Sequence, residues 1–97
     1  MTGRALLSPR AQRDIDDIWT YMAEHWGTEQ AALYVRQIGQ HMAFIAPSPT
    51  IGQACLQVRS GIFRFPSGSH VLFYRSTLDG VDVVRILHAR MDVERQL

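Results

Sequence analysis

The sequence predicts an α+β domain in which an antiparallel hairpin of two helices packs on one face of an antiparallel β-sheet. Three observations lead to this fold. Apolar residues recur at helical spacing from residue 11 to residue 45, the pattern becomes that of strands from residue 62 onward, and a chain of 97 residues has room for one domain. We therefore expect a single domain over residues 1–97, in the order strand, helix, helix and three-stranded meander.

The composition is that of a soluble globular domain, with 46% apolar and 20% charged residues. Ten basic and nine acidic side chains leave a formal charge of +1, which excludes an overall positive field that would draw the protein onto nucleic acid. All ten cations are arginine, which bind carboxylate or phosphate bidentately, although GC-rich coding bias would give the same count. Cys55 is the only cysteine, and the chain shows neither an export signal nor a membrane-spanning stretch, so we expect a cytoplasmic protein without membrane contact.

A short strand is expected at residues 4–7, and the first helix follows it. Ser8 supplies a capping hydroxyl, and Pro9 suits the first helical position, where a missing N–H costs nothing. The helix should end near His25. Its buried stripe consists of Ala11, Ile15, Ile18 and Met22.

A second helix should begin directly after Gly27, which suits the left-handed residue at a helix end, with Thr28 as the new cap. Its buried stripe consists of Ala31, Val35, Ile38, Met42 and Ile45, and it ends before Pro47. Three aromatic residues flank the stripes of the two helices: Trp19, Trp26 and Tyr34. Aromatic residues at such positions usually complete a core, and contact with a partner is the alternative.

Three strands are expected at residues 62–65, 70–75 and 81–88. A two-residue turn at Ser67–Gly68 would place Phe65 opposite His70. A three-residue loop at 78–80, with Gly80 in the left-handed conformation, would place Phe73 opposite Arg85 and Leu72 opposite Ile86.

Both turns predict the same two faces of the sheet. The face for the helices to cover would hold Phe63, Phe65, His70, Leu72, Tyr74, Val84, Ile86 and His88. The opposite face would hold Ile62, Arg64, Val71, Phe73, Arg75, Val83, Arg85 and Leu87. Burying unpaired charge costs several kcal/mol, so we expect this arginine-bearing face to be open to the tail or to another molecule.

The remaining polar residues favour structural roles. We expect Asp14, Asp16 and Asp17 to form a solvated face, two of them paired with arginines on the same helix, rather than a metal site. His70 and His88 should face each other on the core side, where one neutral ring can donate to the other. Asp92 and Arg90 should pair or anchor the tail, Cys55 should be an inert thiol, and no cofactor is expected.

Four segments of the chain resemble the ParE toxins of bacterial type II toxin–antitoxin systems. They are DDIWTYMAEHWG at 16–27, QAALYV at 30–35, GSHVLFYR at 68–75 and VRILHARMD at 84–92. The resemblance runs from about residue 4 to the end, and it implies the RelE/ParE fold: strand, helical hairpin, antiparallel meander. It also implies a toxin that inhibits DNA gyrase and is neutralised by a ParD antitoxin, whose carboxy-terminal segment wraps the toxin.

On this resemblance we expect a toxin that binds gyrase and forms a hetero-oligomeric complex with a ParD-type ribbon–helix–helix antitoxin, meeting DNA only through that antitoxin. The open sheet face would contact the target or the antitoxin through Arg64, Phe73, Arg75, Arg85, Leu87 and Arg90. The helical hairpin would contact the antitoxin through Trp19, Met22 and Trp26.

Two alternatives stay open: a RelE-like ribosome-dependent mRNA endoribonuclease, and an inactive toxin-fold protein that only binds its antitoxin. A ribonuclease needs a proton-transfer group and cations near the phosphate. The candidates for that chemistry are His88, Arg90, Arg85 and Tyr74. Because the chain has no lysine and the predicted register puts Tyr74 and His88 on the core face, we expect no catalytic residues and favour binding over catalysis.

Overall fold

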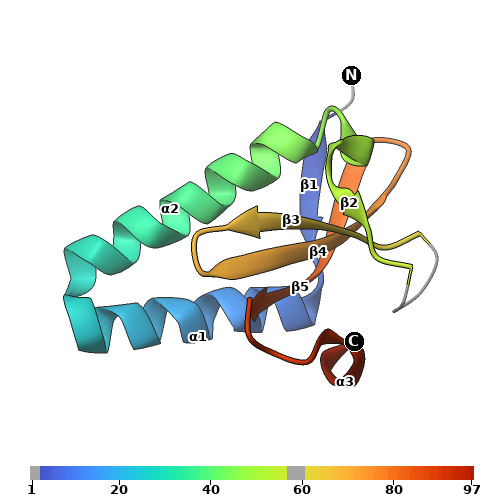
Figure 1. Ribbon diagram of the computed structural model, residues 1–97. Coiled ribbons are helices and arrows are strands. Elements are labelled where there is room, and N and C mark those ends of the chain that lie inside the picture. The colour runs from blue at the N-terminus through green and yellow to red at the C-terminus, as the bar shows by residue number, and fades with distance from the viewer. Residues whose placement is uncertain (1–2, 57–60) are drawn as a thin grey trace.

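A pair of long helices lies against one five-stranded sheet in the computed structural model, which describes residues 3–56 and 61–97 (Figure 1). The predicted α+β architecture is confirmed. The elements in chain order are β1 (Arg4–Leu7), α1 (Pro9–Trp26), α2 (Thr28–Ile45), a short 3-10 turn (Pro49–Ile51), β2 (Gln53–Ala54), β3 (Phe63–Ser67), β4 (His70–Ser76), β5 (Gly80–His88) and α3 (Val93–Gln96).

The start of α1 and the connection to α2 follow from local sequence. The Ser8 hydroxyl accepts a hydrogen bond from the N–H of Ala11 at 3.0 Å, and Pro9 is the first helical residue, as predicted. Gly27 has a φ of 92°, a conformation that favours glycine, and this single residue separates the two helices. Thr28 is not the cap that we predicted, because α2 already includes it and no side chain caps that helix.

The sheet has the strand order β1-β5-β4-β3-β2. The meander β3–β4–β5 is antiparallel, as predicted, but β1 runs parallel to β5, so the sheet is mixed rather than wholly antiparallel. The two-residue strand β2, which we did not predict, adds to the outer edge of β3. A side chain at Gly80 would place its Cβ 1.9 Å from the carbonyl oxygen of Arg4, so glycine is required where β1 joins β5.

The turn between β3 and β4 lies one residue later than predicted. Ser67 pairs with His70, so Gly68 and Ser69 form the turn and Phe65 lies opposite Leu72 instead of His70. The error moves each partner by two residues. Because side chains alternate with a period of two, the predicted faces of β3 and β4 are unchanged.

The register between β4 and β5 is correct where it was predicted, because two departures from the expected backbone cancel. The chain turns at Leu78 and Asp79, with the N–H of Thr77 bonded to the carbonyl of Gly80, so the loop is one residue shorter than expected. A β-bulge then adds one residue to β5, and Arg85 still lies opposite Phe73. Between loop and bulge the faces are reversed, so Val83 is in the core under the helices and Val84 is on the opposite face.

The principal core lies between the helical hairpin and the sheet. Its buried members are Ala11, Ile18, Ile38, Ile45, Ala46, Leu72, Tyr74, Val81, Val83 and Ile86. These include residues of both predicted helical stripes and of the predicted core face of the sheet.

A second, smaller core lies on the opposite face of the sheet, which we expected to be left for the tail or for another molecule. Its buried members are Cys55, Ile62, Val71, Phe73 and Leu87, with Val84, Val93 and Leu97 packed against them. Val93 and Leu97 come from α3 and the residue after it, so the end of the chain folds back beneath the sheet (Figure 1). Of the two covers that we expected for this face, the tail or another molecule, it is the tail that packs on its apolar residues.

Candidate functional site

The exposed apolar surface of this molecule lies on the helical hairpin. Trp26 is 67% exposed and Trp19 is 39% exposed, so the prediction that these two rings complete the core is wrong. Each helix has 18 residues and is about 27 Å long. The connected ends of the two helices project beyond the β3–β4 turn (Figure 1).

A groove of about 480 Å³ opens between this projecting end and the edge of the sheet. Its walls are Asp17, Ile18, Tyr21, Met22 and Trp26 from α1 and Tyr34 from α2, and its floor is Ser69, His70 and His88. Two of the three hairpin residues predicted to bind a partner, Met22 and Trp26, line this groove. Its volume is within the range typical of ligand-binding clefts.

The two histidines of the floor lie across the β4–β5 pair, as predicted. His70 pairs with His88, and their rings meet edge to face with centroids 5.4 Å apart. They do not share the expected hydrogen bond, because each Nδ1 has another partner. The hydroxyl of Tyr34 lies 2.6 Å from Nδ1 of His70, and the N–H of Arg90 donates to Nδ1 of His88 at 3.1 Å.

Tyr34 joins the groove to the β3–β4 turn. Its hydroxyl accepts from the N–H of Ser69 at 2.9 Å, lies 3.5 Å from the carbonyl of Ser67 and is 2.6 Å from Nδ1 of His70, so it links the turn to the imidazole. Burial and then the neighbouring His88 lower the pKa of His70, although Asp14 has an opposing effect, so the neutral form is favoured.

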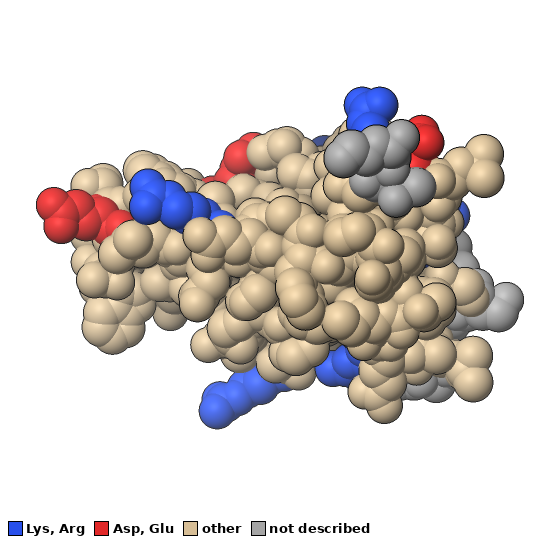
Figure 2. Space-filling model, turned by 90° about the horizontal axis from the view of Figure 1, so that it is seen from above, with Lys and Arg blue, Asp and Glu red and all other residues tan. Residues whose placement is uncertain are grey.

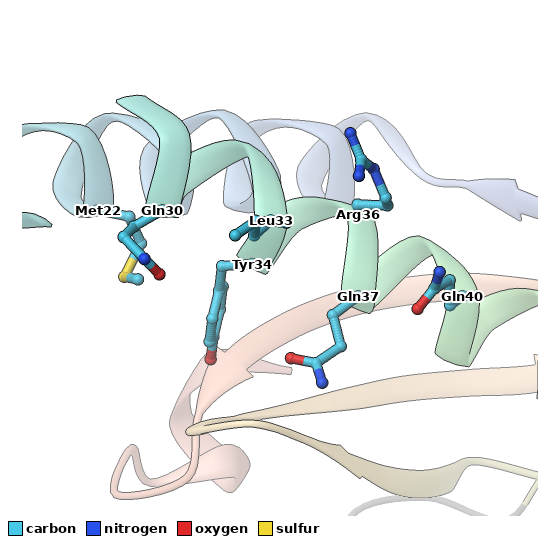
Figure 3. Close-up of a pocket in the computed structure, with 7 residues that line it drawn as sticks. All are labelled: Met22, Gln30, Leu33, Tyr34, Arg36, Gln37 and Gln40. Carbon is cyan, nitrogen blue, oxygen red and sulfur yellow. The ribbon is translucent and has the colours of Figure 1, made fainter. Parts of the chain in front are cut away.

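A second, more polar hollow of about 370 Å³ follows α2. It shares Met22 and Tyr34 with the groove, and Gln30, Leu33, Arg36, Gln37 and Gln40 complete its lining. Figure 3 shows Tyr34 and Gln37 directed toward the sheet and Arg36 directed away from it. Seen from above, the molecule has few charged side chains over most of its face, and those present lie toward the margins (Figure 2).

On the opposite face of the sheet, half of the predicted binding residues are not accessible. Phe73 is 3% exposed and Leu87 is 2% exposed, both within the second core. Arg64 is half-buried, with its guanidinium 5.7 Å from the centre of the Phe73 ring. Arg75 and Arg90 are exposed, as we expected.

Arg85 is the third inaccessible residue, because it forms a bidentate ion pair with Asp14 of α1. Its Nε and Nη2 donate to the two carboxylate oxygens at 2.8 and 2.9 Å, and its Nη1 donates to the carbonyl of Gln96 at 2.9 Å. Asp14 also accepts from the backbone N–H of Ile86, at the part of β5 that β1 does not reach. These hydrogen bonds raise the pKa of Arg85, against the effect of burial. We had predicted that Asp14 belongs to a solvated face, and this prediction is wrong.

The residues considered for ribonuclease chemistry do not come together. Tyr74 is fully buried, its hydroxyl accepts from the N–H of Gly52 and donates to the carbonyl of Pro49, and burial raises its pKa. It pairs with Val83, whereas His88 pairs with His70 at the other end of β4. Because Arg85 is bound to Asp14, the only two of the four candidates that lie together are His88 and Arg90.

Within residues 3–56 and 61–97, no group of three or more histidine, cysteine or acidic side chains is arranged to hold a metal ion. No helix in that part of the chain is long and apolar enough to cross a membrane. Asp92 caps α3 by accepting from the N–H of Glu94, and its nearest cation is Arg95 at 3.8 Å, so the predicted pairing with Arg90 is wrong.

Sequence reasoning missed Tyr21 and Asp17 as groove residues. A signal for Tyr21 was present, because it lies outside the helical stripe that begins at Ala11 and so faces away from the core. Asp17 carried no such signal, since an acidic residue on the wet side of a helix is ordinary. Its position beside the aromatic wall depends on how α1 lies over the sheet.

Comparison with known proteins gives three findings. The family model described as "ParE toxin of type II toxin-antitoxin system, parDE" matches residues 5–93. The chain is 46% identical over its whole length to the whole of Toxin ParE1 of Mycobacterium tuberculosis, and 45% identical to Toxin ParE1 of Caulobacter vibrioides over 94% of both chains. Its fold resembles a chain of a solved structure titled "Chromosomal ParDE TA system from P. aeruginosa", with a TM-score of 0.76, 17% identity and coverage of 91% of this chain and 95% of that one.

Proposed function

Because the chain belongs to the ParE toxin family of type II toxin–antitoxin systems, we propose that it inhibits DNA gyrase by protein–protein contact and is neutralised by a ParD-type antitoxin. The observation that carries the binding part of this proposal is the exposed aromatic groove on the helical hairpin. Large exposed apolar patches mark interaction sites in soluble proteins. Action on gyrase places the toxin in the cytoplasm.

The antitoxin occupies the hairpin surface in this proposal, through Trp19, Met22 and Trp26. A helix or an extended segment can bury these side chains together, because they lie at i, i+3 and i+7 on α1. The antitoxin is a ribbon–helix–helix protein that binds DNA, so the toxin meets DNA only within the hetero-oligomeric complex.

The target is contacted through arginines that the fold leaves accessible. Arg75 and Arg90 are exposed, and Arg64 is half-exposed. Their guanidinium groups can pair with carboxylates of a partner protein. Phe73, Arg85 and Leu87 support this surface from inside and do not contact the target unless the end of the chain moves away.

Inhibition proceeds without chemistry on a substrate. The dispersal of Tyr74, Arg85 and His88 supports this view, because general acid–base catalysis requires the proton-transfer group and the stabilising cations within hydrogen-bond reach of one phosphate. Tyr74 is held in two buried hydrogen bonds, and Arg85 is neutralised by Asp14.

The test is a parallel assay of purified toxin on gyrase supercoiling and on programmed ribosomes. We expect loss of supercoiling, restoration by the antitoxin and intact message. Cleaved message with normal supercoiling would establish the ribonuclease alternative. Neither effect, with antitoxin binding retained, would identify an inactive toxin-fold protein.

Charge reversal separates the two partner surfaces. Arg64→Glu should weaken gyrase inhibition while the antitoxin still binds, because the hairpin is untouched. Arg4→Glu is the matched control, since Arg4 is an exposed arginine on the far edge strand β1. Equal inhibition by wild type and Arg64→Glu would remove Arg64 from the target surface.

A further inference from the structure

The groove on the hairpin contains an acidic side chain without a counter-ion among the described residues. Of the residues that the structure describes, Asp17 is the only acidic one in the groove lining, and none in the lining is an arginine. The neighbouring carboxylates are engaged, since Asp14 binds Arg85 and Asp16 accepts from the side chain of Gln12 at 3.2 Å. Within the described part of the chain, Asp17 takes part in no ion pair.

Aromatic rings line the same groove. Tyr21 lies one turn after Asp17 on the same side of α1, whereas Trp26 lies about 13 Å from Asp17 along the helix, and Tyr34 faces them from α2. The ring of Tyr21 stacks on His25 with centroids 4.0 Å apart, and Nδ1 of His25 donates to the carbonyl of Tyr21 at 2.8 Å. The stacking holds the Tyr21 ring in place. Faces of tyrosine and tryptophan attract cations, most strongly where water is displaced.

The floor of the groove adds a hydrogen-bond donor without adding charge. Nδ1 of His88 accepts from a backbone N–H, so the neutral ring carries its proton on Nε2. This Nε2 bonds to no other residue in the described ranges. An imidazole N–H suits a backbone carbonyl of an entering peptide.

We propose that this groove receives an arginine or lysine side chain of the antitoxin, with the cation against Asp17 and the ring of Tyr21, and its aliphatic stem along Met22. The proposal rests on the proposed function, because it takes the antitoxin as the occupant. A carboxylate would be repelled by Asp17. A purely apolar side chain would strip water from Asp17 without replacing it, which costs free energy.

The experiment measures antitoxin affinity for wild-type toxin and for Asp17→Asn, which removes the charge and keeps the shape. We expect binding about tenfold weaker and less sensitive to salt, because one ion pair and its cation–π support are lost. Tyr21→Leu should lower affinity by a similar factor while keeping an apolar wall. Asp16→Asn, one residue away and outside the groove lining, is the matched control and should bind like wild type.

Replacing each arginine and lysine of the toxin-binding segment of the antitoxin by glutamine identifies the partner. One of these substitutions should weaken binding to wild-type toxin but should not weaken binding to the Asp17→Asn toxin any further. Such coupling is expected when the two side chains contact each other directly. Asp17→Asn that binds within twofold of wild type, or no coupled antitoxin residue, would overturn the inference and leave the proposed function intact. An antitoxin that does not bind wild-type toxin would overturn both.

Discussion

Two surfaces of this molecule differ in what covers them. The outer face of the sheet, apolar and rich in arginine, was expected to be left for the tail or for another molecule, and the tail, together with Cys55, covers its apolar residues. The aromatic flank of the hairpin was expected to complete the core or to contact a partner, and Trp19 and Trp26 are exposed. The difference teaches that a periodic pattern tells which side chains share a face, whereas the cover of that face depends on distant parts of the chain and on how the hairpin lies across the sheet.

The largest expected effect is on stability in the second core. Phe73→Ala should lower the free energy of unfolding by about 4 kcal/mol, because it leaves a cavity under the end of the chain. Trp26→Ala should lower it by less than about 1 kcal/mol, since that ring is mostly in water. Urea denaturation of the two variants measures both values, and equal losses would erase the distinction between the surfaces.

A slightly smaller effect on stability is expected where α1 meets the part of β5 that does not pair with β1. Asp14→Ala should cost about 3 kcal/mol, because it leaves the guanidinium of Arg85 and the N–H of Ile86 unpaired in a largely buried site. Asp16→Ala is the control, and its loss should stay within about 0.5 kcal/mol. A small loss for Asp14→Ala would mean that Arg85 reaches water and that the outer face is open there.

The smallest effect concerns pH and the groove. The folded pKa of His70 lies below its ordinary value of 6.5, so from that pH downward the unfolded chain takes up a proton that the folded ring resists. The free energy of unfolding should therefore fall as the pH drops from 6.5 toward the folded pKa, and remain level above it. The groups that face the ring are Tyr34 from α2, Asp14 and Asp17 from α1, and His88 from β5.

His70→Asn should flatten this part of the pH profile when thermal unfolding is followed between pH 5 and pH 7.5. The same acidification should weaken antitoxin binding, because a protonated His70 ring repels a cation in the groove. A profile unchanged by His70→Asn would assign the dependence to other groups.

Much of the sheet could be predicted because local errors left the faces intact. Because the turn is displaced by one residue, the partner of Phe65 changes by two positions, and the new partner lies on the same face of the sheet. The bulge in β5 offset the short loop at Leu78–Asp79, so Arg85 still faced Phe73. Only Val83 and Val84, between loop and bulge, changed faces, and no feature of the sequence marks a bulge there.

The site was harder to predict because its contacts join distant elements. The facing of His70 and His88 followed from strand register and is confirmed. The pairing of Asp14 with Arg85 did not follow from the sequence, since Arg10 lies four residues from Asp14 and offered a local partner. The overhang of the helices beyond the β3–β4 turn depends on how the hairpin lies across the sheet, which the sequence does not state.

The most direct test of the account is amide hydrogen exchange of the toxin with and without its antitoxin. The account predicts new protection in the second half of α1, the first half of α2 and the β3–β4 turn around Ser69. Exchange in residues 84–97 should be unchanged, because the outer face of the sheet already has its own cover. New protection confined to residues 84–97, with the hairpin unaffected, would contradict it.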